Sequence, residues 1–183
     1  MLDLSEDSVL TRLGVGKHLM LAADAKETLT AALSGGAFPG IPAALGDSVQ
    51  GLIDTYQLLN DPDLAGDQRM ISLEDGAFRN VYILTDNLTR KLDSSVAQSI
   101  RADRLMLLGL VTGSTTQDEW RQALGEPTRT VSVSAESAEL RRLCAGQTDY
   151  YAWWSNATLY LHADEDGVLR TVMLMQAENG GEN

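Results

Sequence analysis

The sequence predicts an α+β protein made of two tandem modules, each with helices packed on an antiparallel sheet. Three observations lead to this prediction. Apolar residues recur at helical spacing in some segments and alternate at strand spacing in others. Two hairpin segments share one sequence pattern, and the composition, 44% apolar and 22% charged, is typical of a globular protein. We expect the first module at residues 1–86 and the second, with the larger sheet, at residues 87–183.

The first half of the chain contains two expected helices and a hairpin. Residues 17–33 are rich in alanine and leucine at helical spacing, and a double glycine follows them. A second helix is expected from Asp47 or Ser48, either of which can cap it, to about residue 59. Residues 70–84 predict a hairpin, because two apolar segments flank an Asp-Gly turn.

The second half begins with an ambiguous segment and then alternates. Residues 88–108 have apolar side chains spaced by four, at Leu88, Leu92, Val96 and Ile100, which favours a helix, but their last four residues could equally start a strand. Thr115 or Thr116 can cap a helix in which Glu119 completes a capping box. Strands are expected at 130–133, 150–154, 158–161 and 168–175, with a short helix or loop at 136–143.

The repeated pattern is D-G-x-x-R-x-V-x-[IL], at residues 75–83 and again at residues 166–174. Turn geometry explains the Asp-Gly pair and strand alternation explains the apolar positions. Neither requires arginine at the same place twice. We therefore predict a duplication in which Val81 and Val172 occupy equivalent strand positions.

The chain carries 14 basic and 26 acidic residues, a formal net charge of −12. Such a charge repels phosphate and argues against binding nucleic acid through a basic surface. The charge is uneven, because residues 76–142 contain 9 basic and 8 acidic side chains while both ends are acidic. No apolar run is long enough to span a membrane, so no membrane span is expected.

A family resemblance accompanies the repeat. Residues 113–127, GSTTQDEWRQALGEP, resemble the helix-plus-sheet module of the beta-lactamase-inhibitor-protein-like fold and of SmpA/OmlA envelope lipoproteins. Residues 33–48 are similar to the opening of the uncharacterised YjgB-like domain of bacterial envelope proteins. The resemblance covers about residues 17–175 and implies an extracytoplasmic protein whose export signal has been removed. Two features depart from it: the first repeat lacks the Gly-x-Pro after its helix, and no lipobox cysteine or signal precedes it, which keeps a cytoplasmic location as the alternative.

Residues that could carry chemistry are few. His18 and His162 are the only histidines, no serine lies in a nucleophile-elbow motif, and both histidines are expected to be structural. Cys144 is the only cysteine and is expected to be a small buried apolar residue. Residues 164–166 gather three carboxylates, either as a weak calcium site or as a solvated hairpin tip. No cofactor or metal is expected.

The aromatic residues point to binding. Six of the ten lie between residues 120 and 160, and residues 150–154 alternate across a predicted strand. We expect Tyr150 and Trp154 to face the core and Tyr151 and Trp153 to form an outward patch that binds a protein or ligand. The sequence thus predicts a non-enzymatic binding protein. The alternatives are an inhibitor of a secreted enzyme, an acidic cytoplasmic chaperone and a small hydrolase.

Overall fold

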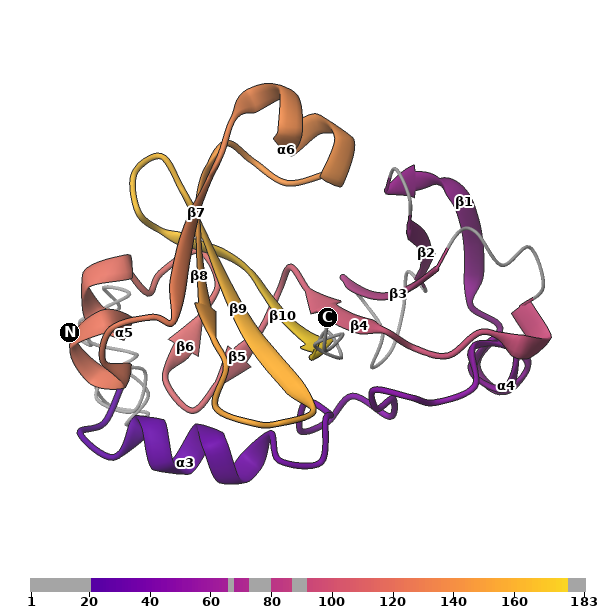
Figure 1. Cartoon of the computed structure of the whole chain (residues 1–183), viewed down its shortest axis with the longest axis horizontal. Helices are drawn as coiled ribbons and strands as arrows, with labels where there is room; N and C mark the ends of the chain where they lie inside the picture. Colours follow the sequence, from indigo (N-terminus) through magenta and orange to yellow (C-terminus); the bar gives the residue numbers. More distant parts are fainter. Residues whose placement is uncertain (1–20, 66–67, 73–79, 87–91, 178–183) are drawn as a thin grey trace, which may run out of the picture.

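The computed structural model describes residues 21–65, 68–72, 80–86 and 92–177, and it shows an α+β protein (Figure 1). The α-helices of these residues are α3 (Ala25–Ala32), α4 (Val49–Tyr56), α5 (Gln117–Leu124) and α6 (Ala135–Arg141). The strands are β1 (Leu59–Ala65), β2 (Gln68–Ser72), β3 (Val81–Asp86), β4 (Ser99–Ala102), β5 (Met106–Leu107), β6 (Leu110–Val111), β7 (Arg129–Val133), β8 (Gly146–Tyr151), β9 (Ala157–Asp164) and β10 (Leu169–Gln176).

Eight of the strands form one antiparallel sheet in the order β1-β2-β3-β4-β10-β9-β8-β7. The strands β5 and β6 form a separate hairpin. The chain therefore makes two meanders, β1 to β4 and β7 to β10, and the last strand of each pairs with the other at the centre of the sheet. In the described residues, β1 and β7 are the two edge strands.

The helix caps match the sequence well. Ser48 caps α4 by accepting a hydrogen bond from the backbone of Gly51, and Thr116 and Glu119 form the expected capping box at α5. Gly125 ends α5 with a φ of 84°, a conformation that favours glycine. The expected first helix is shorter than predicted, because it begins at Ala25; residues 1–20 lie outside the described part of the chain.

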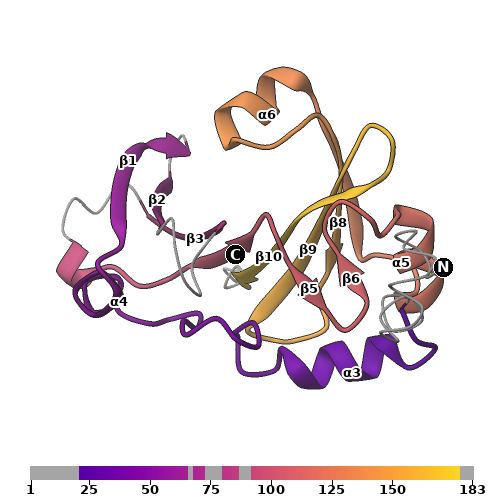
Figure 2. The same ribbon diagram turned by 180° about the vertical axis from the view of Figure 1, so that it is seen from behind.

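One face of the sheet carries the core. The helices α3, α4 and α5 lie on one side of the sheet and α6 lies on the other (Figures 1 and 2). A ladder of apolar side chains crosses neighbouring strands on the helix-covered face, and their paired positions are Val81, Ala102, Val172 and Leu161. Trp120 and Leu124 of α5 and Leu29 of α3 are fully or almost fully buried against it. We call this the covered face and the opposite one the open face.

In its described part, residues 92–108, the ambiguous segment contains strands and no α-helix: β5 lies where a strand was the alternative, and β4 lies where the spacing favoured a helix. Residues 92–94 form a single 3₁₀ turn, and β4 then runs between β3 and β10. Ile100 and Ala102 are completely buried there. Pairing on both edges stabilises the strand more than the four-residue apolar spacing stabilises a helix, so tertiary context decides this segment.

The predicted alignment of the two hairpins is wrong. The hairpin of β2 and β3 exists as predicted, although its Asp75-Gly76 turn lies outside the described residues. Val81, however, lies in the third strand of the first meander and Val172 in the fourth strand of the second. The two valines pair with the same residue, Ala102, from opposite sides. They are therefore neighbours of one strand rather than equivalents.

The two meanders do share another feature: the backbone before α4 and the backbone before α5 make equivalent hydrogen bonds. At the start of α4, the amide of Gly46 donates to Ala97 at 2.8 Å, just before β4. At the start of α5, the amide of Gly113 donates to Leu169 at 2.7 Å, where β10 begins. The cap residues Ser48 and Thr116 make isolated antiparallel bridges to the same two segments. Each helix start is thus bound to the entrance of the fourth strand of its own meander.

Candidate binding face

The first residue of the predicted patch, Tyr151, lies in the core, so the prediction that it faces outward is wrong. Its side chain is 0% exposed, and its hydroxyl donates to the carbonyl of Gly125 at 3.1 Å, beneath α5. Burial raises the pKa of this phenol above its ordinary value. Tyr151 pairs with Leu159, a core residue of β9, which fixes its side on the covered face.

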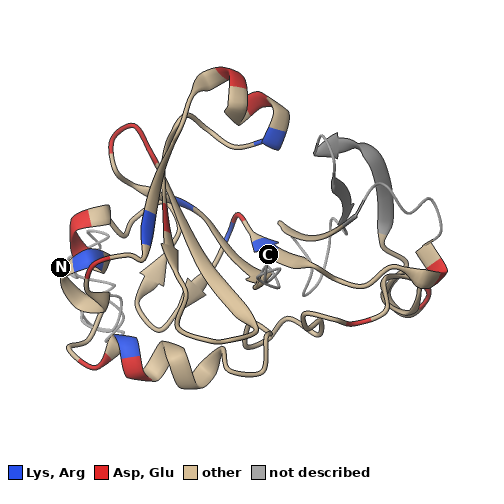
Figure 3. Cartoon of the chain, viewed as in Figure 1, with Lys and Arg blue, Asp and Glu red and all other residues tan. Residues whose placement is uncertain are grey.

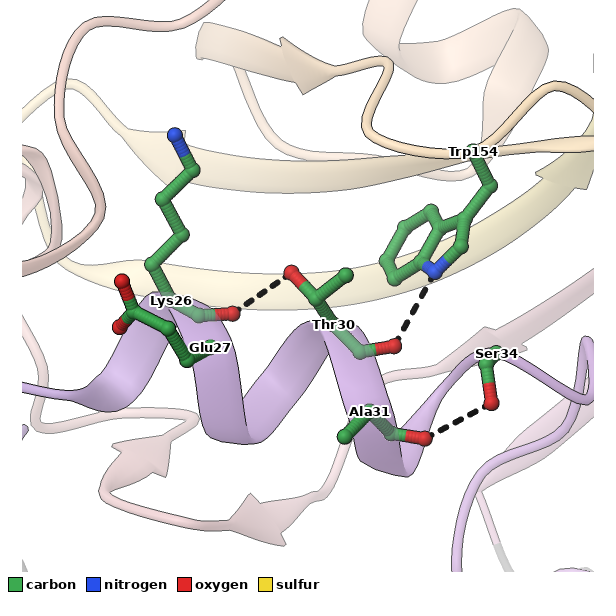
Figure 4. A pocket seen from close by; sticks show the side chains of 6 residues that line it. All are labelled: Lys26, Glu27, Thr30, Ala31, Ser34 and Trp154. Carbon is green, nitrogen blue, oxygen red and sulfur yellow. Dashed lines mark hydrogen bonds between the residues drawn. The ribbon is translucent and has the colours of Figure 1, made fainter.

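Trp153 and Trp154 lie beyond the end of the strand, because β8 ends at Tyr151. Alternation therefore does not apply to them. The ring of Trp153 packs 5.0 Å from that of Tyr151, so it is half-buried on the covered side rather than outward. The indole N–H of Trp154 donates to the carbonyl of Thr30 in α3 at 3.1 Å (Figure 4). Both tryptophans serve to attach α3 to the sheet.

The hollow beside Trp154 does not form a ligand site. It is a wide, shallow space of about 490 Å³, lined by Lys26, Glu27, Thr30, Ala31, Ser34 and Trp154. The hydroxyls of Thr30 and Ser34 both donate to carbonyls of their own helix, as Figure 4 shows. Ligand pockets normally have a few polar groups directed at one point, and the hydroxyls of this hollow are not so directed.

The open face carries a continuous row of large side chains. Strand register places Arg129, Tyr150, Tyr160, Met173, Arg101 and Tyr82 directly opposite one another across β7, β8, β9, β10, β4 and β3. We call these six residues the transverse row. Because side chains alternate along each strand, the row lies on the face away from the apolar ladder.

Contacts within the transverse row are close. The guanidinium of Arg129 lies 4.2 Å from the ring centre of Tyr150, and the rings of Tyr150 and Tyr160 are 4.3 Å apart. The guanidinium of Arg101 lies 5.4 Å from the ring of Tyr82. These are cation–π and aromatic contacts, which hold the side chains in place without burying them fully. Arg129 is exposed, Tyr160, Met173 and Tyr82 are half-buried, and Tyr150 is only 9% exposed.

Residues 134–145, the α6 segment, cover part of the open face. Arg101 donates to the carbonyls of Arg141 and Arg142 at 2.9 and 2.6 Å, and it forms a two-bond ion pair with Asp103. As a result Arg101 is only 5% exposed. Toward β7, β8 and β9, Arg129 is exposed and Tyr160 is half-buried, whereas Tyr150 between them is only 9% exposed.

Charged side chains also differ between the parts of the molecule. The helices α3, α5 and α6 carry both acidic and basic residues, whereas the only charged residue of β7 is Arg129, at the end of the transverse row (Figure 3). On the covered face, the fully buried carboxylate of Asp149 accepts hydrogen bonds from Trp120, Arg121 and Thr130 at 2.6–3.0 Å. This network joins α5 to β7 and β8, and each of its oxygens has partners, so its role is structural.

His162 has the partners of a structural histidine. Its Nδ1 lies 2.9 Å from the hydroxyl of Thr148 and its Nε2 lies 3.0 Å from the carbonyl of Cys144. The Cys144 sulfur is 3.4 Å from Nε2, but burial raises the pKa of the thiol and lowers the pKa of the imidazole. These shifts favour neutral thiol and neutral imidazole, whereas a nucleophilic cysteine needs a thiolate. His18 lies outside the described residues.

In the acidic turn at residues 164–166, the carboxylate of Asp164 is bonded to other groups of the same turn and of β10. Asp164 accepts hydrogen bonds from the backbone of Asp166 and Val168 and pairs with Arg170 at 2.6 Å. These bonds hold the turn before β10. Among the described residues, no cluster of histidine, cysteine and acidic side chains is arranged to hold a metal ion.

Sequence reasoning missed most of the transverse row for one reason. The alternation Leu159, Tyr160, Leu161 in β9 is a usable signal that Tyr160 lies opposite the core. The approach of Arg129 to Tyr150 depends on the register of β7 and β8, which are separated by the α6 segment. Local patterns do not fix such a register.

Comparison with protein-family models, with curated proteins and with solved structures found no significant match. No helix in the described part of the chain is long and apolar enough to cross a lipid bilayer. The fold and the site thus define a class only: an α+β protein with one helix-covered sheet face and one open aromatic face.

Proposed function

We propose that the chain is a non-enzymatic binding protein that recognises a protein partner through the open part of the transverse row. The observation that carries this proposal is the unbroken contact of Arg129, Tyr150 and Tyr160 on the open face, where Arg129 is exposed, Tyr160 is half-buried and Tyr150 is 9% exposed. Tyrosine and arginine are enriched among the residues that dominate binding energy in protein interfaces, and methionine is enriched at interfaces generally. Rigid neighbours reduce the entropy lost on binding.

We further propose that the chain is a tandem of two modules of the beta-lactamase-inhibitor-protein-like kind. The mirrored strand order and the two matching helix starts support this proposal. In this scheme the first module extends through β4, so the boundary falls after residue 102 rather than at residue 86. The resemblance to envelope proteins favours an extracytoplasmic location, which the gene sequence upstream of Met1 and cell fractionation would test.

Site-specific photo-crosslinking tests the binding role. A photoreactive phenylalanine analogue replaces Tyr160 on the open face or, as the control, Thr28 on the exposed surface of α3. The protein is irradiated in the cells that produce it, and adducts are identified by mass spectrometry. We expect one specific protein adduct from position 160 and none from position 28. Adducts from position 28 alone would contradict the proposal.

A further inference from the structure

The two edges of the eight-stranded sheet differ in how they are protected against pairing. The edge strand β1 contains Pro62 between two aspartates, and its register with β2 is irregular between Asp61 and Ala65. Proline, charge and irregularity are the usual ways in which proteins block an edge strand. The other edge, β7, has regular pairing with β8 along all five residues and contains neither proline nor an acidic residue.

Strand β7 is also well suited to pairing by composition. Its sequence is Arg-Thr-Val-Ser-Val, in which three residues are β-branched. Arg129, Thr130 and Ser132 are exposed, and Val131 is half-buried. The chain is strongly acidic overall, but β7 belongs to the segment of residues 76–142, where 9 basic side chains balance 8 acidic ones. Charge repulsion is therefore weakest in this part of the sequence.

We infer that the edge of β7 pairs with the β7 edge of a second copy of this chain, in an antiparallel two-fold dimer centred on Val131. The strand is complementary to itself in this register. Val131 faces Val131 of the other copy, Thr130 faces Ser132, and Arg129 faces Val133. Valine pairs and hydroxyl pairs are favourable across antiparallel strands, and no like charges oppose each other. The two copies of Arg129 lie four residues apart along the strand direction, about 13 Å.

This pairing would extend the function proposed above. Arg129 begins the transverse row at the β7 edge, so a dimer joins the open faces of two chains into one surface. A five-residue strand pair buries less than a standard stable interface, so we expect a reversible dimer that dissociates on dilution. The dimer does not depend on the identity of the protein partner, and its failure would leave the binding proposal intact.

Analytical ultracentrifugation of the full chain from about 1 to 200 µM, a range that covers weak interfaces, tests the inference. We expect the wild type to shift from monomer to dimer over this range. Val131→Asp places two carboxylates opposite each other and should raise the dimer dissociation constant at least about tenfold. Val131→Thr keeps the β-branched shape and should still dimerise. Asn60→Asp adds the same charge to the β1 edge and should leave the dimer unchanged.

Backbone hydrogen exchange provides a readout that does not depend on any variant folding. Amides of residues 129–133 should exchange more slowly at 200 µM than at 1 µM, whereas those of β1 should not change with concentration. A wild type that stays monomeric throughout the range would overturn the inference. So would a dimer in which exchange at residues 129–133 is independent of concentration.

Discussion

Tyr150 and Tyr151 are adjacent in β8, yet they belong to opposite faces of the sheet and to different kinds of environment. Tyr151 is fully buried under α5 and bonded to Gly125, whereas Tyr150, itself 9% exposed, contacts the exposed Arg129 and the half-buried Tyr160 on the open face. The comparison teaches that an aromatic-rich strand supplies the core on one side and a contact surface on the other. Replacing residues of the two faces should therefore have different consequences.

The largest effect is expected from Tyr151→Ala. Removing a buried aromatic side chain leaves a cavity and should lower the free energy of unfolding by about 4 kcal/mol. Tyr160→Ala, on the open face, should lower it by no more than about 1 kcal/mol. Urea unfolding followed by circular dichroism measures both. Equal losses would remove the distinction between the two faces.

A somewhat smaller loss is expected from Asp149→Ala. The change leaves Trp120 and Arg121 without their buried acceptor and should cost about 3 kcal/mol of stability. The cost stays at the lower end of the range because Arg121 is 30% exposed and can be hydrated in part. Asp118→Ala, at an exposed acidic residue of α5, the helix that carries Trp120 and Arg121, is the control and should change stability by less than about 0.5 kcal/mol. A loss below about 1 kcal/mol for Asp149→Ala would show that the hydrogen bonds of Asp149 do not contribute to the stability of the fold.

Stability should fall in two pH ranges, the higher set by His162 on the open face and the lower by Asp149 on the covered face. Burial lowers the pKa of His162, beneath the α6 segment, from 6.5. The unfolded chain then binds more protons, so stability should begin to fall as the pH drops below about 6.5. Burial alone would raise the pKa of Asp149, but hydrogen bonds from Arg121, Thr130 and Trp120 outweigh it and hold the pKa below 3.8. Its contribution should be lost only below about pH 4.

Matched variants assign the two steps of this titration. His162→Gln should remove the loss that begins near pH 6.5, and Asp149→Asn should remove the loss below about pH 4. Denaturant unfolding at a series of pH values measures each step. Persistence of the upper step in His162→Gln would show that it originates elsewhere.

The sequence predicts features that depend on neighbouring residues better than features that depend on pairing between distant strands. Caps are local, so the predicted pairs of candidates, Asp47 or Ser48 and Thr115 or Thr116, each include the observed cap, and the capping box with Glu119 is confirmed. The face of Tyr151 and Trp153 was mispredicted because it depends on where β8 ends and on its pairing with Leu159. The strand at residues 99–102 needed neighbours on both sides, and the equivalence of Val81 with Val172 rested on a hairpin motif that recurs in non-equivalent strands.

The smallest predicted effect is a gain. Leu108 has a φ of 50° and precedes Gly109 in the turn between β5 and β6, where left-handed conformations favour asparagine or glycine. Its side chain is 46% exposed, so little burial offsets the strain. Leu108→Asn should raise the free energy of unfolding by about 0.5 kcal/mol or more. A melting temperature below that of the wild type would show that Leu108 packs usefully.

The affinity of the crosslinked partner for Tyr160→Ala tests the central claim most directly, when measured together with the melting temperature of the variant. The account predicts binding at least about tenfold weaker than for the wild type, with a melting temperature within about 3 °C of it. Thr28→Ala, on the exposed surface of α3, should bind as the wild type does. Unchanged binding by Tyr160→Ala would contradict the claim that the open face is the binding surface.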